Sequence, residues 1–213
     1  MIGGISGLYA VTADEPDDAK LTAHVHAALA GGARLVQYRN KRADPALRHR
    51  QAKALLSLCR RHGVPLIVND DAELALKIGA DGLHLGCEDG SIAAARERLG
   101  ADCIIGASCY NRLDNAREAQ QAGANYVAFG SFFSSSVKPG AVQAPLALLR
   151  EAKRELGLPV VAIGGINRAN APQLIAAGAD CLAVISALFT APDIRLAAQE
   201  FSALFPVHEN PIR

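Results

Sequence analysis

The sequence predicts a single α/β domain over residues 1–213, a (β/α)₈ TIM barrel. One observation is a repeated Gly-Ala pair followed by a short apolar run, which starts at Gly32, Gly79, Gly123 and Gly178. Another is that a helical stretch separates each apolar run from the next. Strands buried on both faces that alternate with helices form parallel sheets, and units about 25 residues apart are typical of this barrel. An open, doubly wound sheet is the alternative.

The expected elements follow in order along the chain. Glycine suits the left-handed stop at the end of a helix, so each Gly-Ala pair closes a helix and opens a strand. The clearest helix runs from Asp44 to about His62, because Asp44 can cap its first turn and Pro45 is tolerated there. The expected strands are Leu8 to Val11, Leu35 to Gln37, Leu66 to Val68, Gly82 to Leu85, Cys103 to Gly106, Tyr126 to Phe129, Pro159 to Ile163 and Cys181 to Val184.

The composition excludes several classes of protein. Half of the residues are hydrophobic and a fifth are charged, which suits a folded core rather than disorder. The 22 basic and 21 acidic residues nearly cancel, so a broad basic surface for nucleic acid or anionic membranes is not expected. The longest uncharged span, 119–137, is too polar to cross a membrane.

The start of the chain and its cysteines point to one compartment. Residues 1–13 lack the basic region and cleavage site of a signal peptide, so we expect a cytoplasmic protein. The five cysteines form no C-x-x-C pair, so we expect reduced thiols that serve as packing residues, without disulfides or a zinc site.

Cationic side chains follow the second expected strand. The period of two along a strand puts Gln37, Arg39 and Lys41 on one face and Tyr38 on the other. Catalytic groups of such barrels lie at the carboxyl ends of strands. Solvated residues just beyond the strand are the alternative, but three such residues at alternate positions favour a site for a multiply charged anion such as a diphosphate.

Acidic side chains follow the next two strands. Asn69, Asp70 and Asp71 come after the third, and Glu88 and Asp89 come after the fourth. Any one of them can be an ordinary helix cap, and for Asp71 or Glu88 alone we favour that role. Beside a cationic strand end, however, they favour a Mg²⁺ site, because Mg²⁺ takes one or two carboxylates and completes its shell with water and substrate phosphates.

The last three strands end in glycine and hydroxyl residues. The stretch from Gly130 to Gly140 is expected to be a mobile lid rather than a plain surface loop, given its hydroxyls and its two adjacent Phe residues. The seventh strand ends in Gly164-Gly165 and the eighth in Ile185-Ser186-Ala187. Barrels often bind phosphate with these two loops, and glycines let a ligand approach closely, although a double glycine is often just a tight turn.

Two further side chains are ambiguous. Ser108 ends the fifth strand as either a satisfied turn hydroxyl or a ligand contact, and His84 is interpreted as a wall histidine rather than a base. Together the strand ends describe one anion site with a metal and one built from backbone. A diphosphate and a monophosphate substrate would fit them.

The sequence closely resembles the thiamine phosphate synthase family over nearly its whole length. The segments that carry the resemblance are Gly7 to Thr12, Gln37-x-Arg39-x-Lys41, Val68 to Asp70, Gly82 to Gly86, Glu88-Asp89, Gly106 to Ser108, the Ser-rich loop ending in Lys138, Ala162 to Ile166 and Val184 to Ala187.

The resemblance implies a reaction and its residues. Members join 4-amino-2-methyl-5-hydroxymethylpyrimidine diphosphate to a thiazole phosphate by a dissociative substitution, which yields thiamine monophosphate and diphosphate. Asp70 and Asp89 would hold Mg²⁺, and Arg39, Lys41, Ser108 and Lys138 would act on the leaving group. The pyrimidine diphosphate would be bound by Gln37, Arg39, Lys41, Asn69, Ser108 and Lys138, and the thiazole phosphate by Ser135, Ser136, Val137, Gly165, Ile185 and Ser186.

The chain departs from the family pattern at three positions. Cys87 stands where Gln is common, Val137 where Thr is common, and Asn40 where an acid is common. Val137 has no hydroxyl, so only its backbone N–H could donate a hydrogen bond to the thiazole phosphate. A thiazole tautomerase and a non-catalytic phosphate-binding regulator are the alternatives, but neither needs the complete metal and diphosphate set. A homo-oligomer stays possible.

Overall fold

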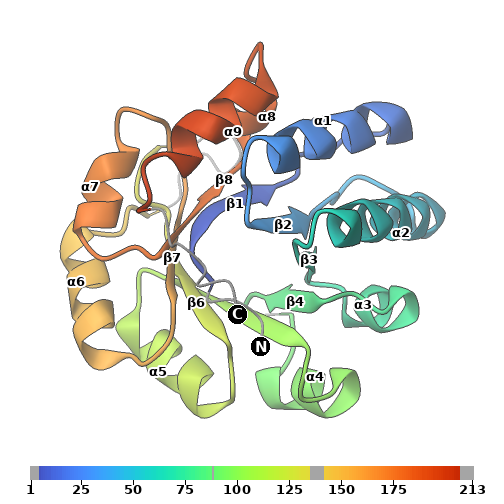
Figure 1. The fold of residues 1–213 in the computed structure, drawn as a ribbon. Coiled ribbons are helices and arrows are strands. Elements are labelled where there is room, and N and C mark those ends of the chain that lie inside the picture. Colours follow the sequence, from blue (N-terminus) through green and yellow to red (C-terminus); the bar gives the residue numbers. More distant parts are fainter. Residues whose placement is uncertain (1–4, 88, 135–141, 207–213) are drawn as a thin grey trace, which may run out of the picture.

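Eight parallel strands form a closed barrel at the centre of the molecule (Figure 1). This computed structural model describes residues 5–87, 89–134 and 142–206. Each strand pairs with its neighbour in the sequence, and β1 closes the sheet by pairing with β8, where Leu8 lies opposite Leu182. The barrel expected from the sequence is therefore confirmed, and the open sheet is excluded.

The strands lie close to where the apolar runs predicted them. The largest difference is β5, whose apolar run ends at Gly106 and whose expected last residue is Ser108, but which continues to Tyr110. The strands are β1 (Gly7–Val11), β2 (Leu35–Tyr38), β3 (Leu66–Asn69), β4 (Gly82–Leu85), β5 (Ile104–Tyr110), β6 (Tyr126–Phe129), β7 (Val160–Ile163) and β8 (Cys181–Val184).

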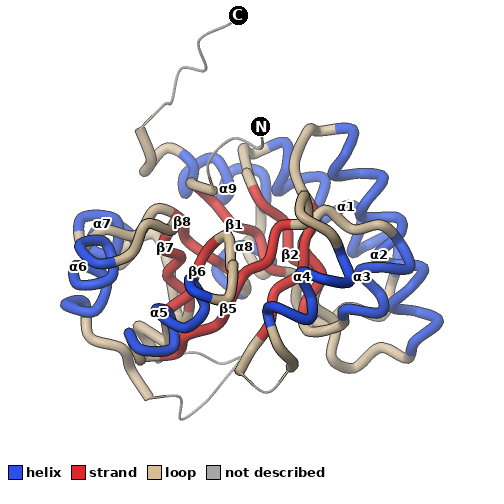
Figure 2. The backbone as a smooth tube through the Cα atoms, turned by 90° about the horizontal axis from the view of Figure 1, so that it is seen from below, coloured by secondary structure: helices blue, strands red, loops and turns tan. Residues whose placement is uncertain are grey.

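The helices surround the strands as an outer layer (Figure 2). Asp44 caps α2 as expected, because its carboxylate accepts a hydrogen bond of 2.8 Å from the backbone N–H of Leu47. The helices are α1 (Asp18–Ala30), α2 (Pro45–Arg61), α3 (Ala72–Ile78), α4 (Ile92–Leu99), α5 (Leu113–Gln121), α6 (Leu146–Glu155), α7 (Ala171–Ala176), α8 (Ser186–Phe189) and α9 (Ile194–Ser202).

The short helix α8 corrects one expectation. The sequence analysis treated Ser186 and Ala187 as the end of the eighth strand, but β8 ends at Val184 and Ser186 is the first residue of α8. An extra helix after β8 is a common addition to this barrel.

The Gly-Ala repeat has a structural role beyond stopping helices. Its glycines have positive φ, for example 66° at Gly79 and 110° at Gly178, as the left-handed stop requires. In the copies that start at Gly79, Gly123 and Gly178, the Asp or Asn two positions after the glycine accepts a backbone hydrogen bond from a neighbouring strand. Asp81 accepts from Leu66, Asn125 from Ile105 and Asp180 from Val160, at 2.8 to 2.9 Å. The repeat therefore satisfies backbone donors at the amino ends of the barrel.

Two hydrophobic cores hold the fold together. The larger fills the layer between strands and helices, and the smaller fills the barrel interior with Tyr9, Ile67, Tyr126 and their neighbours. Four of the five cysteines are buried as expected, but Cys87 is exposed, so the expectation that all five are packing residues is wrong. The five thiols are free.

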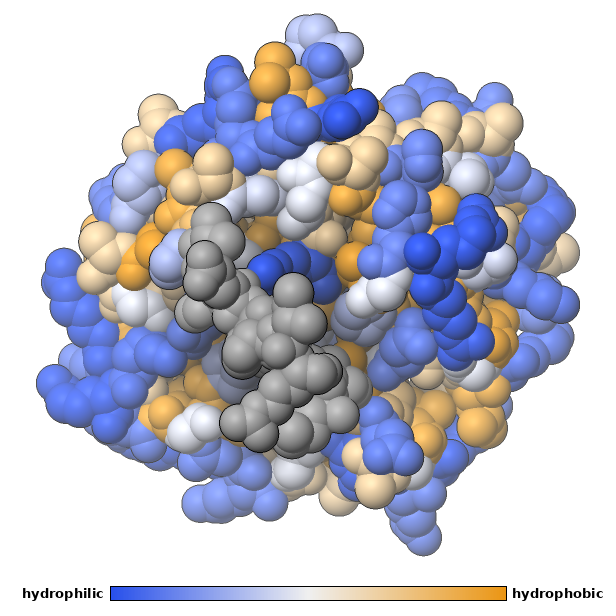
Figure 3. Space-filling view, viewed as in Figure 1, coloured by the Kyte–Doolittle hydropathy of each residue, from blue (hydrophilic) through white to orange (hydrophobic). Residues whose placement is uncertain are grey.

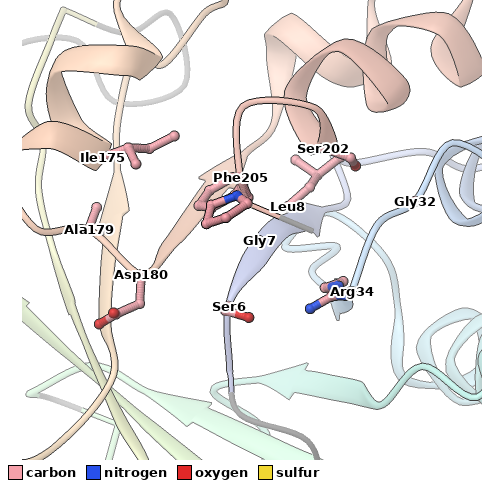
Figure 4. A pocket seen from close by; sticks show the side chains of 11 residues that line it. Ser6, Gly7, Leu8, Gly32, Arg34, Ile175, Ala179, Asp180, Ser202 and Phe205 are labelled. Carbon is pink, nitrogen blue, oxygen red and sulfur yellow. The ribbon is translucent and has the colours of Figure 1, made fainter. Parts of the chain in front are cut away.

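The amino face of the barrel carries a hollow of about 420 Å³ that Arg34, Asp180, Ser202 and Phe205 help to line (Figure 4). Its Asp180 carboxylate is already engaged by the Lys153 ammonium at 2.9 Å and by the Val160 backbone. Groups at this end of a barrel usually serve stability. On the face drawn in Figure 3, hydrophilic residues cover most of the outer helices and apolar residues are interspersed among them. Within the described ranges, no helix has the length and apolar character needed to span a membrane.

Candidate active site

At the carboxyl end of β2, Gln37 and Tyr38 face opposite sides of the strand, as the alternation predicted. Gln37 faces the barrel interior, where its Nε2 donates to the Tyr9 hydroxyl at 2.8 Å. Tyr38 faces outward and donates to Oε1 of Gln51 on α2 at 2.9 Å. Because the strand ends at Tyr38, Arg39 and Lys41 lie in the loop beyond it.

Two carboxylates hold these cations at the rim. The Asp14 carboxylate lies 3.4 Å from the Arg39 guanidinium and accepts the Lys41 backbone N–H at 2.8 Å. The Lys41 ammonium lies 3.1 Å from Oδ2 of Asp70. Sequence reasoning missed Asp14, although it follows β1 as closely as the cations follow β2. The rim between β1 and β3 is thus an array of alternating charges.

Asp70 and Asp89 lie side by side at the ends of β3 and β4. Asp70 has a φ of 62°, a left-handed conformation that Asp tolerates, and its N–H donates to the carbonyl of His84 at 2.8 Å. Burial and the nearby Asp89 carboxylate raise the pKa of Asp70, and Lys41 opposes that rise. A carboxylate pair under mutual repulsion, on a backbone held in a strained region, favours a functional role over a structural one.

This pair fits the ligand set that Mg²⁺ needs. The described residues contain no cluster of three or more His, Cys, Asp or Glu side chains that could enclose a metal. Mg²⁺ does not require one, since it binds through one or two carboxylates, waters and substrate phosphates. Asp71 caps α3 by accepting from Leu74 at 2.9 Å, as interpreted from the sequence, and Glu88 lies outside the described residues.

A buried hydrogen-bonded series, which we call the cross-barrel network, crosses the interior below the rim. It links residues of five strands: Gln37 to Tyr9 at 2.8 Å, Tyr9 to Tyr126 at 2.8 Å, Tyr126 to Nδ1 of His84 at 2.9 Å, and Nε2 of His84 to Ser108 at 2.9 Å. Burial lowers the pKa of His84 to about 4 and raises the pKa values of Tyr9 and Tyr126, so the three rings are neutral at pH 7.

The network confirms part of the sequence interpretation and extends it. His84 is a wall histidine, as expected. Ser108, left open between a turn hydroxyl and a ligand contact, is half-buried and bonded to His84. Asn69, at the end of β3, lies in register with His84. Tyr9 and Tyr126 were not singled out, because they are 117 positions apart and only barrel closure brings them together.

Gly106 makes room for the network. A Cβ at this position would stand 2.0 Å from Cζ of Tyr126 and 2.3 Å from its hydroxyl oxygen. No side chain other than hydrogen fits beside that phenol, so Gly106 allows the Tyr126 ring to stack on His84 with 5.6 Å between centroids. The glycine thus serves packing inside the barrel.

An uncharged cleft of about 210 Å³ lies at the ends of β7 and β8. Among the described residues, no acceptor takes the backbone N–H of Gly165, Ser186 or Ala187. Such donors suit an anion. The lining residues are Ser134, Ile163, Gly164, Gly165, Ile166, Asn167, Ala183, Ile185, Ser186 and Ala187.

The double glycine accommodates a neighbouring loop as well as the cleft. A Cβ on Gly165, whose φ is 63°, would stand 2.4 Å from the carbonyl oxygen of Ser134. A Cβ on Gly164 would collide with Ser131. We expected these glycines to let a ligand approach, but the side-chain space they leave is filled by residues that follow β6.

The loop after β6 is described only at its two ends. Phe132 is buried in the outer core and Phe133 packs against that core, so the pair does not support the lid interpretation. The predicted site residues Ser135, Ser136, Val137 and Lys138 lie outside the described residues.

A further hollow of about 410 Å³ connects the two halves of the rim. It shares Arg39 with the charged array, and Ile185 and Ser186 with the uncharged cleft. This hollow therefore places Arg39 of the predicted diphosphate site and Ile185 and Ser186 of the predicted thiazole phosphate site around one cavity.

Comparison with known proteins assigns the chain to a family. The family model described as thiamine monophosphate synthase matches residues 8–188, which is most of the barrel. The chain belongs to the thiamine monophosphate synthase family. It is therefore a transferase, and the alternation of strands and helices is that of the family.

Individual relatives of the thiamine monophosphate synthase family support the assignment. The chain is 61% identical over 199 residues to a thiamine-phosphate synthase of Thiobacillus denitrificans, covering 93% of this chain and 94% of that one. It is 58% identical over 201 residues to one of Methylobacillus flagellatus, covering 94% and 96%. A solved thiamine phosphate pyrophosphorylase of Pyrococcus furiosus matches with a TM-score of 0.83 and 36% identity, covering 93% and 94%.

Proposed function

We propose that this protein transfers the pyrimidinylmethyl group of 4-amino-2-methyl-5-hydroxymethylpyrimidine diphosphate to the ring nitrogen of 4-methyl-5-(2-phosphoethyl)thiazole, or of its carboxylated form. The products are thiamine monophosphate and diphosphate. The observation that carries the proposal is a rim with charged side chains on one side and an uncharged cleft on the other, and a hollow that residues of both sides help to line. Two substrates that each bear phosphate need such a pair.

The charged half suits the leaving group. Arg39 offers a planar fork and Lys41 a point charge, and both are held by carboxylates that a diphosphate can displace. Asp70 and Asp89 would hold Mg²⁺, which neutralises charge that develops on the departing diphosphate. Lys138, which lies outside the described residues, would add a third cation.

The uncharged half suits the acceptor substrate. The phosphate of the thiazole keeps its charge throughout the reaction, so backbone N–H groups of Gly165, Ser186 and Ala187 are sufficient to orient it. Ser135, Ser136 and Val137 would complete this site from the loop after β6. The thiazole would then lie beside Ile185, with its nitrogen directed toward the pyrimidine.

The substitution would be dissociative. The carbon–oxygen bond to the diphosphate breaks first, the aminopyrimidine supports the positive charge on its exocyclic carbon, and the thiazole nitrogen then attacks. No side chain has to act as a nucleophile. The work of Arg39, Lys41 and Ser108 is electrostatic stabilisation of the diphosphate.

One assay tests the function. Purified protein, both substrates and Mg²⁺ are expected to give equal amounts of thiamine monophosphate and diphosphate, and omission of either substrate should abolish both products. Conversion of a carboxylated thiazole without the pyrimidine diphosphate would favour a tautomerase. Tight binding of both ligands without turnover would favour a regulator.

A second measurement tests the order of bond breaking. The bridging oxygen of the pyrimidine diphosphate is isotopically labelled, and the substrate is recovered before complete turnover. If the carbon–oxygen bond breaks first and can re-form, the label spreads into non-bridging positions of the diphosphate. Label that stays in the bridge while product forms would contradict a reversible dissociative step.

A further inference from the structure

We propose that Tyr9, Tyr126 and His84 are positioning residues that couple the two ends of one ligand site. Through the cross-barrel network they make Gln37 a hydrogen-bond acceptor and Ser108 a hydrogen-bond donor toward the same bound molecule. The identity of that molecule, the aminopyrimidine diphosphate, rests on the proposed function. The coupling itself rests on the geometry of the network.

The direction of the network follows from counting protons. Nε2 of Gln37 donates to the Tyr9 oxygen, so the single hydroxyl proton of Tyr9 is left to donate to Tyr126. Tyr126 has accepted from Tyr9, so its own proton goes to Nδ1 of His84. Each phenol therefore accepts one hydrogen bond and donates one, in the same sense.

The direction continues through the imidazole. A neutral imidazole carries one proton, and because Nδ1 of His84 accepts, that proton is on Nε2, which donates to Oγ of Ser108. The Ser108 hydroxyl proton is then not used by the network. Among the described residues, none accepts from Oγ of Ser108 and none donates to Oε1 of Gln37. One acceptor and one donor are thus left for a ligand.

The opposite direction of the hydrogen bonds in the network would leave Ser108 without a proton to donate to an anion. If Gln37 presented its Oε1 to Tyr9, every proton in the network would reverse and the Ser108 hydroxyl would donate to His84. Only lone pairs of Ser108 would then face the ligand, and an anionic oxygen would be repelled. An anion at Ser108 and an N–H donor at Gln37 therefore favour the same state of the network.

This coupling matches the two functional groups of the proposed first substrate. Its amino group supplies an N–H and its diphosphate supplies anionic oxygens. A pyrimidine with a carbonyl in place of the amino group would present an acceptor to Gln37 and favour the wrong direction. The network would thereby select the amino group and the diphosphate together, although Gln37 and Ser108 stand on strands that do not pair.

Nuclear magnetic resonance tests the direction in the unmodified protein. With ¹⁵N-labelled histidine, inorganic diphosphate and Mg²⁺, we expect His84 to show a protonated Nε2 and an unprotonated Nδ1. Its signals can be assigned by proximity to the Tyr126 ring, which stacks on it at 5.6 Å. A proton on Nδ1 would overturn the proposal.

Kinetics test the coupling. The change Tyr126→Phe interrupts the network and keeps the ring, and it should lower kcat/KM for the pyrimidine diphosphate by about tenfold. The matched control is Tyr38→Phe, which also removes the hydroxyl of a buried tyrosine, together with its bond to Gln51 on the outer side of β2. It should change kcat/KM by less than about twofold, and an equal loss in both variants would contradict the proposal.

A double-mutant cycle isolates the coupling from stability. In the parent protein, the loss of kcat/KM in the double variant Gln37→Met/Ser108→Ala should be about tenfold smaller than the product of the losses in the two single variants. In the Tyr126→Phe background, the loss of kcat/KM in the double variant should equal the product of the two single losses. Independent effects in the parent would overturn the coupling.

These experiments separate this inference from the proposed function. The resonance measurement uses inorganic diphosphate and needs no turnover. A protein that fails to form thiamine monophosphate, yet holds the Nε2 proton, would refute the function and leave the network direction supported. An active enzyme with the proton on Nδ1 would refute the inference alone.

Discussion

The two halves of the carboxyl rim differ in the groups that they offer to an anion. Around β1 to β4, charged side chains such as Arg39, Lys41 and Asp70 face one another across the site. Around β7 and β8, the lining residues are uncharged and backbone N–H groups take the place of cations. Under the proposed function this difference follows the chemistry, because charge grows on the leaving diphosphate and stays constant on the thiazole phosphate.

The charged half is also the more easily rearranged. The Lys41 side chain is 54% exposed and that of Asp70 is 28% exposed, and an ion pair in such a setting contributes at most about 1 kcal/mol. Lys41 can therefore exchange Asp70 for a ligand phosphate at little cost. In the uncharged half, Gly165 is packed against Ser134, so its donors are fixed in place before any ligand arrives.

The largest expected effect comes from removing one charge of the metal pair. Asp70→Asn should lower turnover by at least about a hundredfold while the fold is retained, because a metal on a polyanion contributes several kcal/mol. The matched control is Asp71→Asn, since Asn can still cap α3. Activity measured against Mg²⁺ concentration decides the matter, and an unchanged Mg²⁺ dependence in Asp70→Asn would contradict the metal assignment.

His84, in the cross-barrel network, should make the stability of the protein depend on pH. The pKa of His84 is about 4 in the folded protein, below its usual value of about 6.5, so the unfolded chain binds more protons between these values. The free energy of unfolding should therefore fall as pH drops from about 6.5 to about 4, by up to about 3 kcal/mol from this residue. Urea unfolding at several pH values, compared with His84→Gln, isolates the contribution, and identical slopes would contradict it.

A negative charge in the uncharged half should discriminate between the two ligands. Ser186→Asp places a carboxylate beside free backbone donors, so the KM for the thiazole phosphate should rise by about tenfold or more. The KM for the pyrimidine diphosphate should barely move. Ser91→Asp, which adds the same charge at the cap of α4, is the control. Equal weakening of both ligands by Ser186→Asp would mean that the two halves are not separate sites.

The smallest effect concerns the contact between the loops after β6 and β7. Gly165 and Gly79 have nearly the same φ, 63° and 66°, but a Cβ meets the Ser134 carbonyl only at Gly165, while nothing lies within 4 Å at Gly79. Either change to Ala strains the backbone, because Ala disfavours a positive φ. Gly165→Ala should lower the free energy of unfolding by about 1 kcal/mol more than Gly79→Ala does. Thermal unfolding of both variants measures the difference, and equal losses would show that the loop yields freely.

The sequence was sufficient for the architecture because its signals are local. Glycine stops, apolar runs and the Asp44 cap each operate within a few residues, and together they located the eight strands. Most of the charged half was also accessible, since Arg39, Lys41 and Asp70 directly follow consecutive strands, although Asp14 was missed. The prediction failed at Ser186 because a run such as Ile185-Ser186-Ala187 suits a strand end or a short helix equally well.

The cross-barrel network was out of reach for the opposite reason. Tyr9 and Tyr126 look like ordinary apolar strand residues, and nothing in the sequence around either one indicates a hydrogen-bond partner 117 positions away. Gly106 carried a signal that could have been used, since a glycine inside a strand often marks a close approach of another group. What approaches it, the Tyr126 ring, is set by the pairing register of β5 with β6, in which Gly106 lies opposite Tyr126.

Gly106 and the Tyr126 ring also limit how this active site can be transplanted. An engineer who grafts only the rim residues onto another eight-stranded barrel would set them above an apolar interior, where Gln37 and Ser108 lack their partners. Adding Tyr126 without Gly106 would place its ring within 2.4 Å of a new Cβ. The rim, the network and the glycine must be transferred together. The cross-barrel network can therefore change only through several substitutions that compensate one another.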